Sequence, residues 1–282
     1  DFCLSRGLGD VYKRQPYDIW SLYYVNPAGI AKDGVHTTTP CTTCLTVTLK
    51  DGKPVTEAIL MPQTDSQDGV VVDPLGVYVH EFGHWLGLPD LYCTAISCAL
   101  DGVGEWSLMG DGIYNGSPFG SSPAHPDAWC KVHLGWITPA NPQTNPETPG
   151  AITVNPVETN PAVYKMQASI LDPNQYFLIE NRQLAGFDAA IPGHGLLVWL
   201  IDDWVINTNI ASNTVNNNAY RLGVKLMEAD NDFALLQYGC SAGHGIDCGS
   251  PGDPFPGSTG NHRFAPLSKP SSDPYTAPGW VN

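Results

Sequence analysis

The strongest pattern of apolar and polar positions along the chain lies between residues 73 and 87. Apolar side chains recur there with helical spacing, at positions 75, 78, 79, 82, 85 and 86. Asp73 is a favourable N-cap and Pro74 suits the first helical position. Gly87 favours a left-handed end to the helix, and Pro89 prevents its continuation. The pattern therefore predicts a helix over residues 73–87, in a segment that is expected to be buried.

Short apolar runs before this helix predict β-strands. They occupy residues 21–25, 44–49 and 57–61, and a hairpin-like Asp-Gly-Lys turn at 51–53 separates the last two. Residues 88–125, which follow the helix, are rich in Gly, Asp and Ser. We expect this stretch to form an irregular loop.

The second half of the chain is predicted to be rich in β-structure. A second helix is expected over residues 126–137, running into a strand, and the Pro- and Asn-rich stretch at 138–150 is the best internal boundary. Strand-like runs follow at 151–157, 162–169, 175–183, 195–202 and 221–229, with an Asn-rich loop at 207–218. The expected fold class is α+β, with a helix-bearing half at 16–137 and a β-rich half at 138–282.

Composition narrows the possible partners. The chain has 282 residues, of which 42% are hydrophobic, enough for one large domain or two modest ones. No stretch approaches the ~20 uninterrupted apolar residues of a membrane-spanning helix. The net charge is −15, whereas proteins that bind phosphate groups need clustered Lys and Arg. We therefore expect no nucleic-acid partner and no transmembrane segment.

The first fifteen residues do not resemble a natural protein sequence. The letters DVYKRQ within residues 1–15 resemble the translation of a sequencing adaptor. We expect this stretch to be an artefact, so that the protein proper begins near Pro16 as a fragment without its signal peptide. The Gly-, Pro- and Ser-rich tail from residue 249 is expected to stop within a domain.

The chain has eight cysteines, one of them within residues 1–15. The others are three close pairs and one single residue: Cys41 and Cys44, Cys93 and Cys98, Cys240 and Cys248, and Cys130. A Cys-x-x-Cys pair is also typical of zinc knuckles and redox sites, but no second such pair accompanies this one. Short-range disulfides in an exported protein are the favoured interpretation, and the sequence leaves their connectivity open.

The candidate chemistry lies on the predicted helix. His80 and His84 stand four residues apart, so both imidazoles lie on one face and can bind one metal ion. Glu81 projects about 100° round the helix, where it can act as a general base toward a water at the ion. Zinc needs a third protein ligand, and after a sharp turn at Gly87 the next hard ligand is Asp90.

Chance and ordinary core packing are the alternatives to a metal site. A His-Glu-x-x-His match arises by chance in a chain of this length with odds on the order of one per cent. A single histidine in an apolar helix is usually a satisfied core residue. Two histidines and a glutamate would destabilise the fold by roughly several kcal/mol if they were buried unpaired, and a metal ion would compensate for this.

Two sequence stretches carry a family resemblance: HEFGHWLGLPD at 80–90 and GEWSLMGDG at 104–112. They resemble the metzincin zinc endopeptidases and, more narrowly, the M6 (immune inhibitor A-like) family. The resemblance implies a metzincin-like fold with a zinc-binding active-site helix, a Met-turn and a β-rich C-terminal half. It also implies particular roles: zinc ligands His80, His84 and Asp90, general base Glu81, and Met-turn residue Met109 beneath the ligands.

The resemblance implies a secreted zinc endopeptidase that hydrolyses proteins or peptides, with one catalytic Zn²⁺. Tyr114 is a candidate for contact with the oxyanion or substrate, although a packing role is the simpler interpretation. The competing hypothesis is a non-catalytic cell-surface or adhesion module that retains the fold. Glu81 separates the two, because a vestigial domain would be free to lose it.

Acidic loops late in the chain suggest a second metal. Asp230, Asp232 and Asp253 lie in oxygen-rich loops of the kind that calcium prefers, so a structural Ca²⁺ is a further candidate cofactor. Neither the loop of Asp230 and Asp232 nor the loop of Asp253 matches the twelve-residue calcium-binding pattern. Solvated turns are therefore the alternative.

Overall fold

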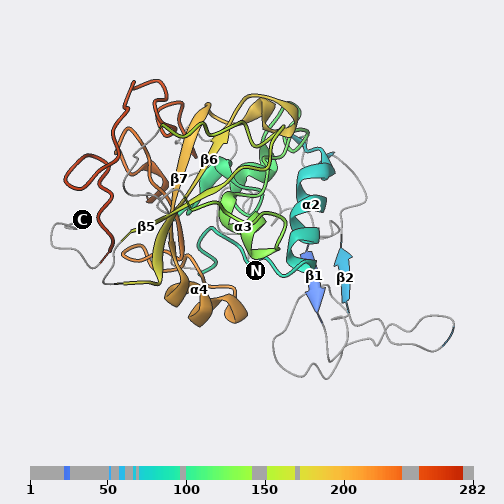
Figure 1. The fold of residues 1–282 in the computed structure, drawn as a ribbon. Helices are drawn as coiled ribbons and strands as arrows, with labels where there is room; N and C mark the ends of the chain where they lie inside the picture. Colours follow the sequence, from blue (N-terminus) through green and yellow to red (C-terminus); the bar gives the residue numbers. More distant parts are fainter. Residues whose placement is uncertain are drawn as a thin grey trace.

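The computed structural model describes residues 22–25, 51, 57–60, 66–67, 70–95, 100–141, 151–168, 172–236 and 248–275. Within these residues the fold is α+β, as the sequence predicts, with helices beside a four-stranded antiparallel sheet (Figure 1). The suspected adaptor at 1–15 and the predicted strand at 44–49 lie outside the described residues.

The predicted first helix is confirmed as α2, Pro74–Trp85. The Asp73 carboxylate caps it by accepting a hydrogen bond from the backbone N–H of Leu75 at 2.9 Å. Pro74 occupies the first turn, where no N–H is needed. At the other end, Gly87 has φ +101°, a left-handed conformation that glycine adopts without strain and that turns the chain away from the helix axis.

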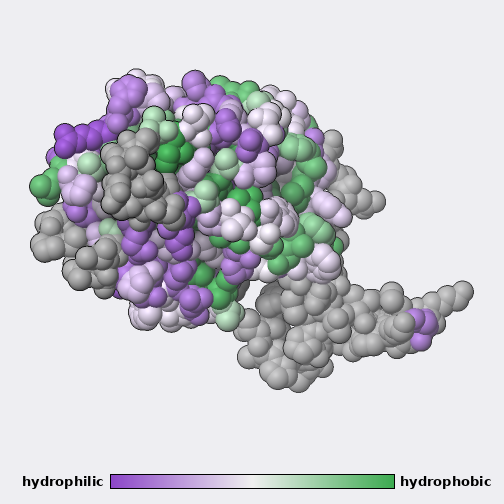
Figure 2. Space-filling model, in the orientation of Figure 1, coloured by the Kyte–Doolittle hydropathy of each residue, from purple (hydrophilic) through white to green (hydrophobic). Residues whose placement is uncertain are grey.

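The buried face of α2 differs from the one that its apolar residues indicate. Tyr78, Phe82 and Trp85 are 40–52% exposed, and hydrophobic surface gathers over this helix in Figure 2. The residues buried instead are Gly76, His80, Glu81 and Gly83. A Cβ at Gly76 would lie 1.9 Å from the Ile113 carbonyl oxygen, so the absence of a side chain lets the loop pack directly against the helix. This close approach turns the aromatic side chains outward.

Residues 100–125 form a mostly irregular segment, as predicted, with two short 3₁₀ helices, η1 at Gly104–Trp106 and η2 at Asp111–Tyr114. The second predicted helix is α3, Ala128–His133, which is capped by Asp127. The strand predicted to follow α3 does not form. Gly135 turns the chain with φ +71°, and the backbone N–H groups of Trp136 and Ile137 both donate to the Lys131 carbonyl.

The central sheet contains four antiparallel strands in the order β5-β6-β7-β8. Their bounds are Tyr164–Gln167, Gln175–Arg182, Gly195–Asp202 and Val224–Leu226. The long pair β6–β7 is in register with Leu178 opposite Trp199, and both residues are fully buried. Short pairs lie earlier in the chain: β1 (Leu22–Val25) with β2 (Glu57–Leu60), and β3 (Ser66–Gln67) with β4 (Val70–Val71).

Two predictions for the second half are wrong. Residues 151–157 form no strand but only an isolated bridge between Pro156 and Asn181, and a proline cannot donate to a β-ladder. The expected loop at 207–218 begins instead within α4, Asp203–Asn209, which continues into η5, Ile210–Ser212. Asp202 starts α4 because its carboxylate accepts a hydrogen bond from the Val205 N–H. Further 3₁₀ turns are η4 (Gly186–Ala190) and η6 (Ala234–Leu236).

A buried ionic network ties α3 and η1 to the sheet. The Lys131 ammonium lies 2.6 Å from the Glu180 carboxylate, and Arg182 pairs with both Glu180 and Asp188. Arg182 also donates to the Trp106 carbonyl at 3.3 Å. Because these charges are almost fully buried, each needs its partners, and the network fixes how the two segments pack.

The cysteines are partly accounted for. Cys93 and Cys248 each take part in a disulfide bond, and Cys130 is free and buried. The other cysteines of the predicted pairs (Cys41, Cys44, Cys98 and Cys240) lie outside the described residues. Among the residues that are described, no helix has the length and apolar character needed to cross a membrane.

Candidate metal centre

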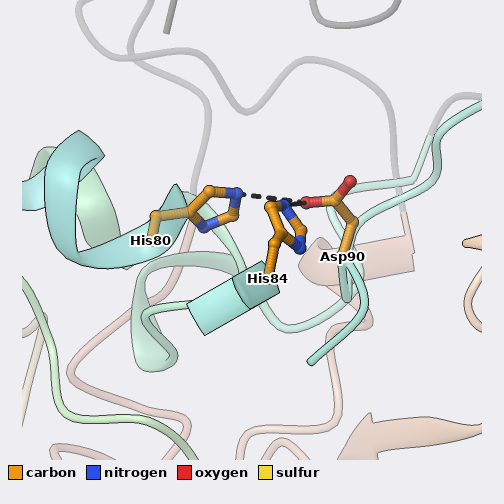
Figure 3. Close-up of side chains that lie close together, drawn as sticks. All are labelled: His80, His84 and Asp90. Atoms are coloured by element: carbon orange, nitrogen blue, oxygen red, sulfur yellow. Dashed lines mark ion pairs between the residues drawn. The ribbon is translucent and has the colours of Figure 1, made fainter. Parts of the chain in front are cut away.

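His80, His84 and Asp90 converge at one point beside α2 (Figure 3). The Nε2 atoms of His80 and His84 lie 3.1 and 3.2 Å from Oδ1 of Asp90. His80 and Asp90 are only 4% and 6% exposed. The helix supplies the histidines from adjacent turns, and the reversal at Gly87 returns the chain so that Asp90 faces them.

Backbone carbonyls fix the orientation of both imidazole rings. Nδ1 of His80 donates to the Leu108 carbonyl, and Nδ1 of His84 donates to the Leu88 carbonyl, each at 2.8 Å. A carbonyl can only accept, so in each neutral ring the hydrogen is on Nδ1 and the lone pair is on Nε2. Both lone pairs therefore point toward Asp90, as they would in a pair of metal-binding histidines.

When both rings are neutral, three acceptor atoms thus meet without a donor. Oδ1 of Asp90 is buried and accepts no hydrogen bond within the described part of the chain, whereas Oδ2 accepts one from Asn213. Four ligand atoms at ~2.0 Å around a tetrahedral zinc ion would lie about 3.3 Å apart. The observed separations of 3.1 and 3.2 Å are close to this value. The nitrogen and oxygen donor set also fits zinc.

The electrostatics of the protein without metal lead to the same conclusion. Burial alone would lower the pKa of His84, but the Asp90 carboxylate raises it to about 9. Burial would raise the pKa of Asp90, but the two histidines hold it well below its usual range. A proton on His84 therefore balances the Asp90 charge when no cation is bound. This pocket stabilises positive charge.

Met109 lies directly beneath the histidine-bearing turn. It is fully buried, and its sulfur would be 2.7 Å from a Cβ at Gly83, the residue that precedes His84. The Met109 carbonyl accepts a hydrogen bond from the Leu91 N–H at 2.8 Å. The Leu108–Met109 segment therefore contacts both the helix and the loop segment that carries Asp90.

Glu81 and Tyr114 also lie near this helix. Glu81 is buried at 7% exposure, and its charge contributes to the raised pKa of His84. Tyr114 ends η2, the 3₁₀ helix that packs against α2 through Ile113 and Gly76, and is half-buried. The general-base role of Glu81 and the substrate role of Tyr114 stay predictions.

Comparison with known proteins finds a family similarity over the segment that carries these residues. Residues 59–137 match the family model of the immune inhibitor A peptidase M6 catalytic domain. Over 59 residues the chain is 41% identical to the pre-pro-metalloprotease PrtV of Vibrio cholerae serotype O1, in strains M66-2 and ATCC 39315 / El Tor Inaba N16961. Within residues 59–137 the chain is therefore similar to the M6 peptidases. The match covers 21% of the chain and 6% of each relative, so the chain spans only a small part of these proteins.

A second cluster of possible metal ligands lies outside the segment that matches the M6 peptidases. Carboxylate oxygens of Glu228, Asp230, Asp232 and Asp253 lie within 4.8 Å of one another. Glu228 and Asp253 are only 3% and 1% exposed. The structure thus brings together the three aspartates predicted from the sequence and adds Glu228, which the sequence analysis missed.

Two kinds of residue around these sites give weak sequence signals. Glu228 lies near the end of the strand-like run at 221–229 and has no neighbouring carboxylate closer than Asp230 in the sequence. Asn213 lies in an Asn-rich stretch that resembles an ordinary loop, yet it contacts Asp90 from 123 residues away. The high density of asparagine at 213–218 is the one feature that distinguishes this stretch from other loops in the sequence.

Proposed function

We propose that this chain carries the catalytic centre of a zinc-dependent endopeptidase. The observation that supports this most strongly is the convergence of His80, His84 and Asp90 as three acceptors with fixed orientation. These residues lie within the segment related to the M6 peptidases. We assign all three as the zinc ligands and Met109 as the Met-turn residue of a metzincin-like fold.

The residues divide the chemistry between them. When bound, zinc supplies Lewis acidity, which polarises a peptide carbonyl and makes water more acidic. Glu81 acts as the general base: its carboxylate takes a proton from the attacking water and delivers it to the leaving amine. Its buried position beside His84 keeps its charge close to the ligands. The Leu88 and Leu108 carbonyls hold the imidazole rings so that no ring rotation is needed.

The substrates and location follow from the same assignment. The substrates would be proteins or peptides, and the enzyme would be exported. The disulfide bonds of Cys93 and Cys248 support an oxidising compartment, and the relatives are named pre-pro-metalloproteases.

Zinc content and proteolysis test the proposal together. The purified 282-residue chain should bind one zinc and cleave casein, and chelation should abolish cleavage until zinc is returned. Glu81→Gln should retain zinc and lose about 10²–10⁴-fold in cleavage rate, the usual contribution of a general base. Zinc binding without any cleavage by the wild type would favour the non-catalytic module. Undiminished cleavage by Glu81→Gln would refute the assigned mechanism.

We also propose that Glu228, Asp230, Asp232 and Asp253 hold a structural calcium ion. Calcium prefers carboxylate oxygens, and this cluster supplies four carboxylates. Burial and the nearby Asp253 raise the pKa of Glu228 to about 9, and burial raises that of Asp253 to about 7. A bound cation would relieve this repulsion. Trp106 donates to Asp253 at 2.7 Å, so an ion there would also stabilise the segment related to the M6 peptidases.

A further inference from the structure

The Asn-rich segment 213–217 packs against the chain that follows the histidine helix. The Thr94 N–H donates to Oδ1 of Asn217 at 2.9 Å, and the Thr94 hydroxyl donates to the Asn213 carbonyl at 2.8 Å. Asn216 donates from Nδ2 to the Leu91 carbonyl at 2.7 Å. Side chains and backbone from the second half of the chain therefore hold residues 90–94 in place.

Asn213 makes the contact with Asp90 itself, through two hydrogen bonds. The Asp90 N–H donates to Oδ1 of Asn213 at 2.7 Å, and Nδ2 of Asn213 donates to Oδ2 of Asp90 at 2.6 Å. The first bond fixes the orientation of the amide, because a backbone N–H can only face an acceptor. The second bond then fixes the carboxylate, with Oδ2 held by Asn213 and Oδ1 free to face the two Nε2 atoms.

The backbone of Asn213 suits this role. It follows η5 in the left-handed conformation, with φ 55° and ψ 40°. Asparagine tolerates this region better than most residues other than glycine. The turn brings the side chain back toward Asp90 while its carbonyl accepts from Thr94.

We propose that Asn213 is a positioning residue for the zinc centre, which selects the carboxylate orientation in which Oδ1 of Asp90 completes the ligand set. This inference rests on the zinc site proposed above. Without the amide, Oδ2 of Asp90 would be left without its donor and the carboxylate could rotate about its χ2 torsion. Partners of this kind behind metal ligands typically change metal affinity by about 10–100-fold.

The test is zinc affinity, measured by chelator competition on the full chain. Asn213→Gly keeps the left-handed backbone accessible but removes both hydrogen bonds, and should weaken zinc binding by about 10–100-fold. Asn213→Asp can still accept from the Asp90 N–H but places a second carboxylate against Oδ2, and should weaken binding further. The matched control is Asn217→Ala, which removes hydrogen bonds to Thr94 in the same loop without touching Asp90.

A spectroscopic readout separates ligand orientation from general loosening of the loop. With Co²⁺ in place of zinc, the visible absorption bands should change in both Asn213 variants and stay like those of the wild type in Asn217→Ala. Thermal unfolding in chelator would report any shared loss of stability.

The outcomes separate this inference from the proposed function. Equal zinc affinity in wild type and both Asn213 variants, or an equal loss in Asn217→Ala and Asn213→Gly, would overturn the role of Asn213 while leaving the zinc site intact. Failure of the wild type to bind zinc would overturn both. If Asn213→Gly does not fold, the comparison of Asn213→Asp with Asn217→Ala decides the question.

Discussion

The close packing of Gly83 against Met109 leads to a prediction about Gly83→Ala. Its effect on the free energy of unfolding should depend on whether Met109 is present. A Cβ at Gly83 would lie 2.7 Å from the Met109 sulfur and 3.5 Å from its terminal methyl. Gly83 lies within α2, where alanine is ordinarily more stable than glycine by about 0.5–1 kcal/mol. Gly83→Ala therefore adds a helix-forming residue and an overlap with Met109 at the same time.

The overlap should dominate in the wild-type background. Forcing an extra methyl into a packed interior costs about 1–3 kcal/mol, which exceeds the gain in helix propensity. Gly83→Ala should thus lower the free energy of unfolding by about 1 kcal/mol. Met109→Ala removes a fully buried side chain and should lower it by about 2–5 kcal/mol. In that background, Gly83→Ala should become neutral or stabilising, because the overlapping atoms are gone.

Urea unfolding of the four proteins in this cycle measures the coupling, which we expect to be about 1–3 kcal/mol. The measurements belong in chelator, so that metal binding does not contribute. Gly76→Ala is a useful comparison: its obstacle is the Ile113 carbonyl, a backbone atom that Met109→Ala cannot relieve. If Gly83→Ala is equally destabilising with and without Met109, the proposed packing of Met109 beneath the histidines is wrong.

Two further predictions concern pH. Because Glu228 has a pKa of about 9 in the folded protein and an ordinary value of 4.5, the unfolded chain loses this proton at lower pH than the folded chain does. Stability without calcium should therefore fall as the pH rises from about 4.5 to 9, by up to ~1.4 kcal/mol per unit, and calcium should reverse this loss. Thermal unfolding at pH 5–9 with and without calcium tests this pH dependence, with magnesium as the control ion. Melting temperatures that do not respond to calcium would contradict the prediction. At the proposed zinc site, binding would displace a proton from His84, whose pKa is about 9, so zinc affinity should rise about tenfold per pH unit between pH 6.5 and 9. Chelator competition across this range checks the slope, and a flat profile would refute the proposed proton displacement.

Local patterns were enough to predict the elements that carry the site. Helix α2 combines an N-cap, an N-terminal proline and a C-terminal glycine, and β6 and β7 are long apolar runs; these signals depend on neighbouring residues only. The face of α2 that becomes buried could not be predicted in this way. Gly76 and Gly83 have no hydrophobic side chains, yet their absent Cβ atoms allow the closest packing.

The convergence of the three proposed ligands was predictable because their spacing is local, whereas the residues that support them come from distant parts of the chain. His80 and His84 are one helical turn apart, and Asp90 follows a short turn. Leu108, Asn213 and Glu228 reach their sites from distant parts of the chain, through backbone carbonyls or common polar side chains that occur in any loop. No pattern within either segment indicates that they will meet.

These supports explain how a folded chain can hold three acceptors together. Each proposed ligand has one polar atom bound to a neighbour: Nδ1 of His80 and of His84 to a backbone carbonyl, and Oδ2 of Asp90 to the Asn213 amide. The other polar atom of each side chain then faces those of the other two. The arrangement destabilises the metal-free fold unless a proton occupies His84. A cation that binds the folded state, and not the unfolded chain, relieves this repulsion and stabilises the fold by mass action. Metal affinity and folding stability in this protein should therefore be coupled through the same three ligands.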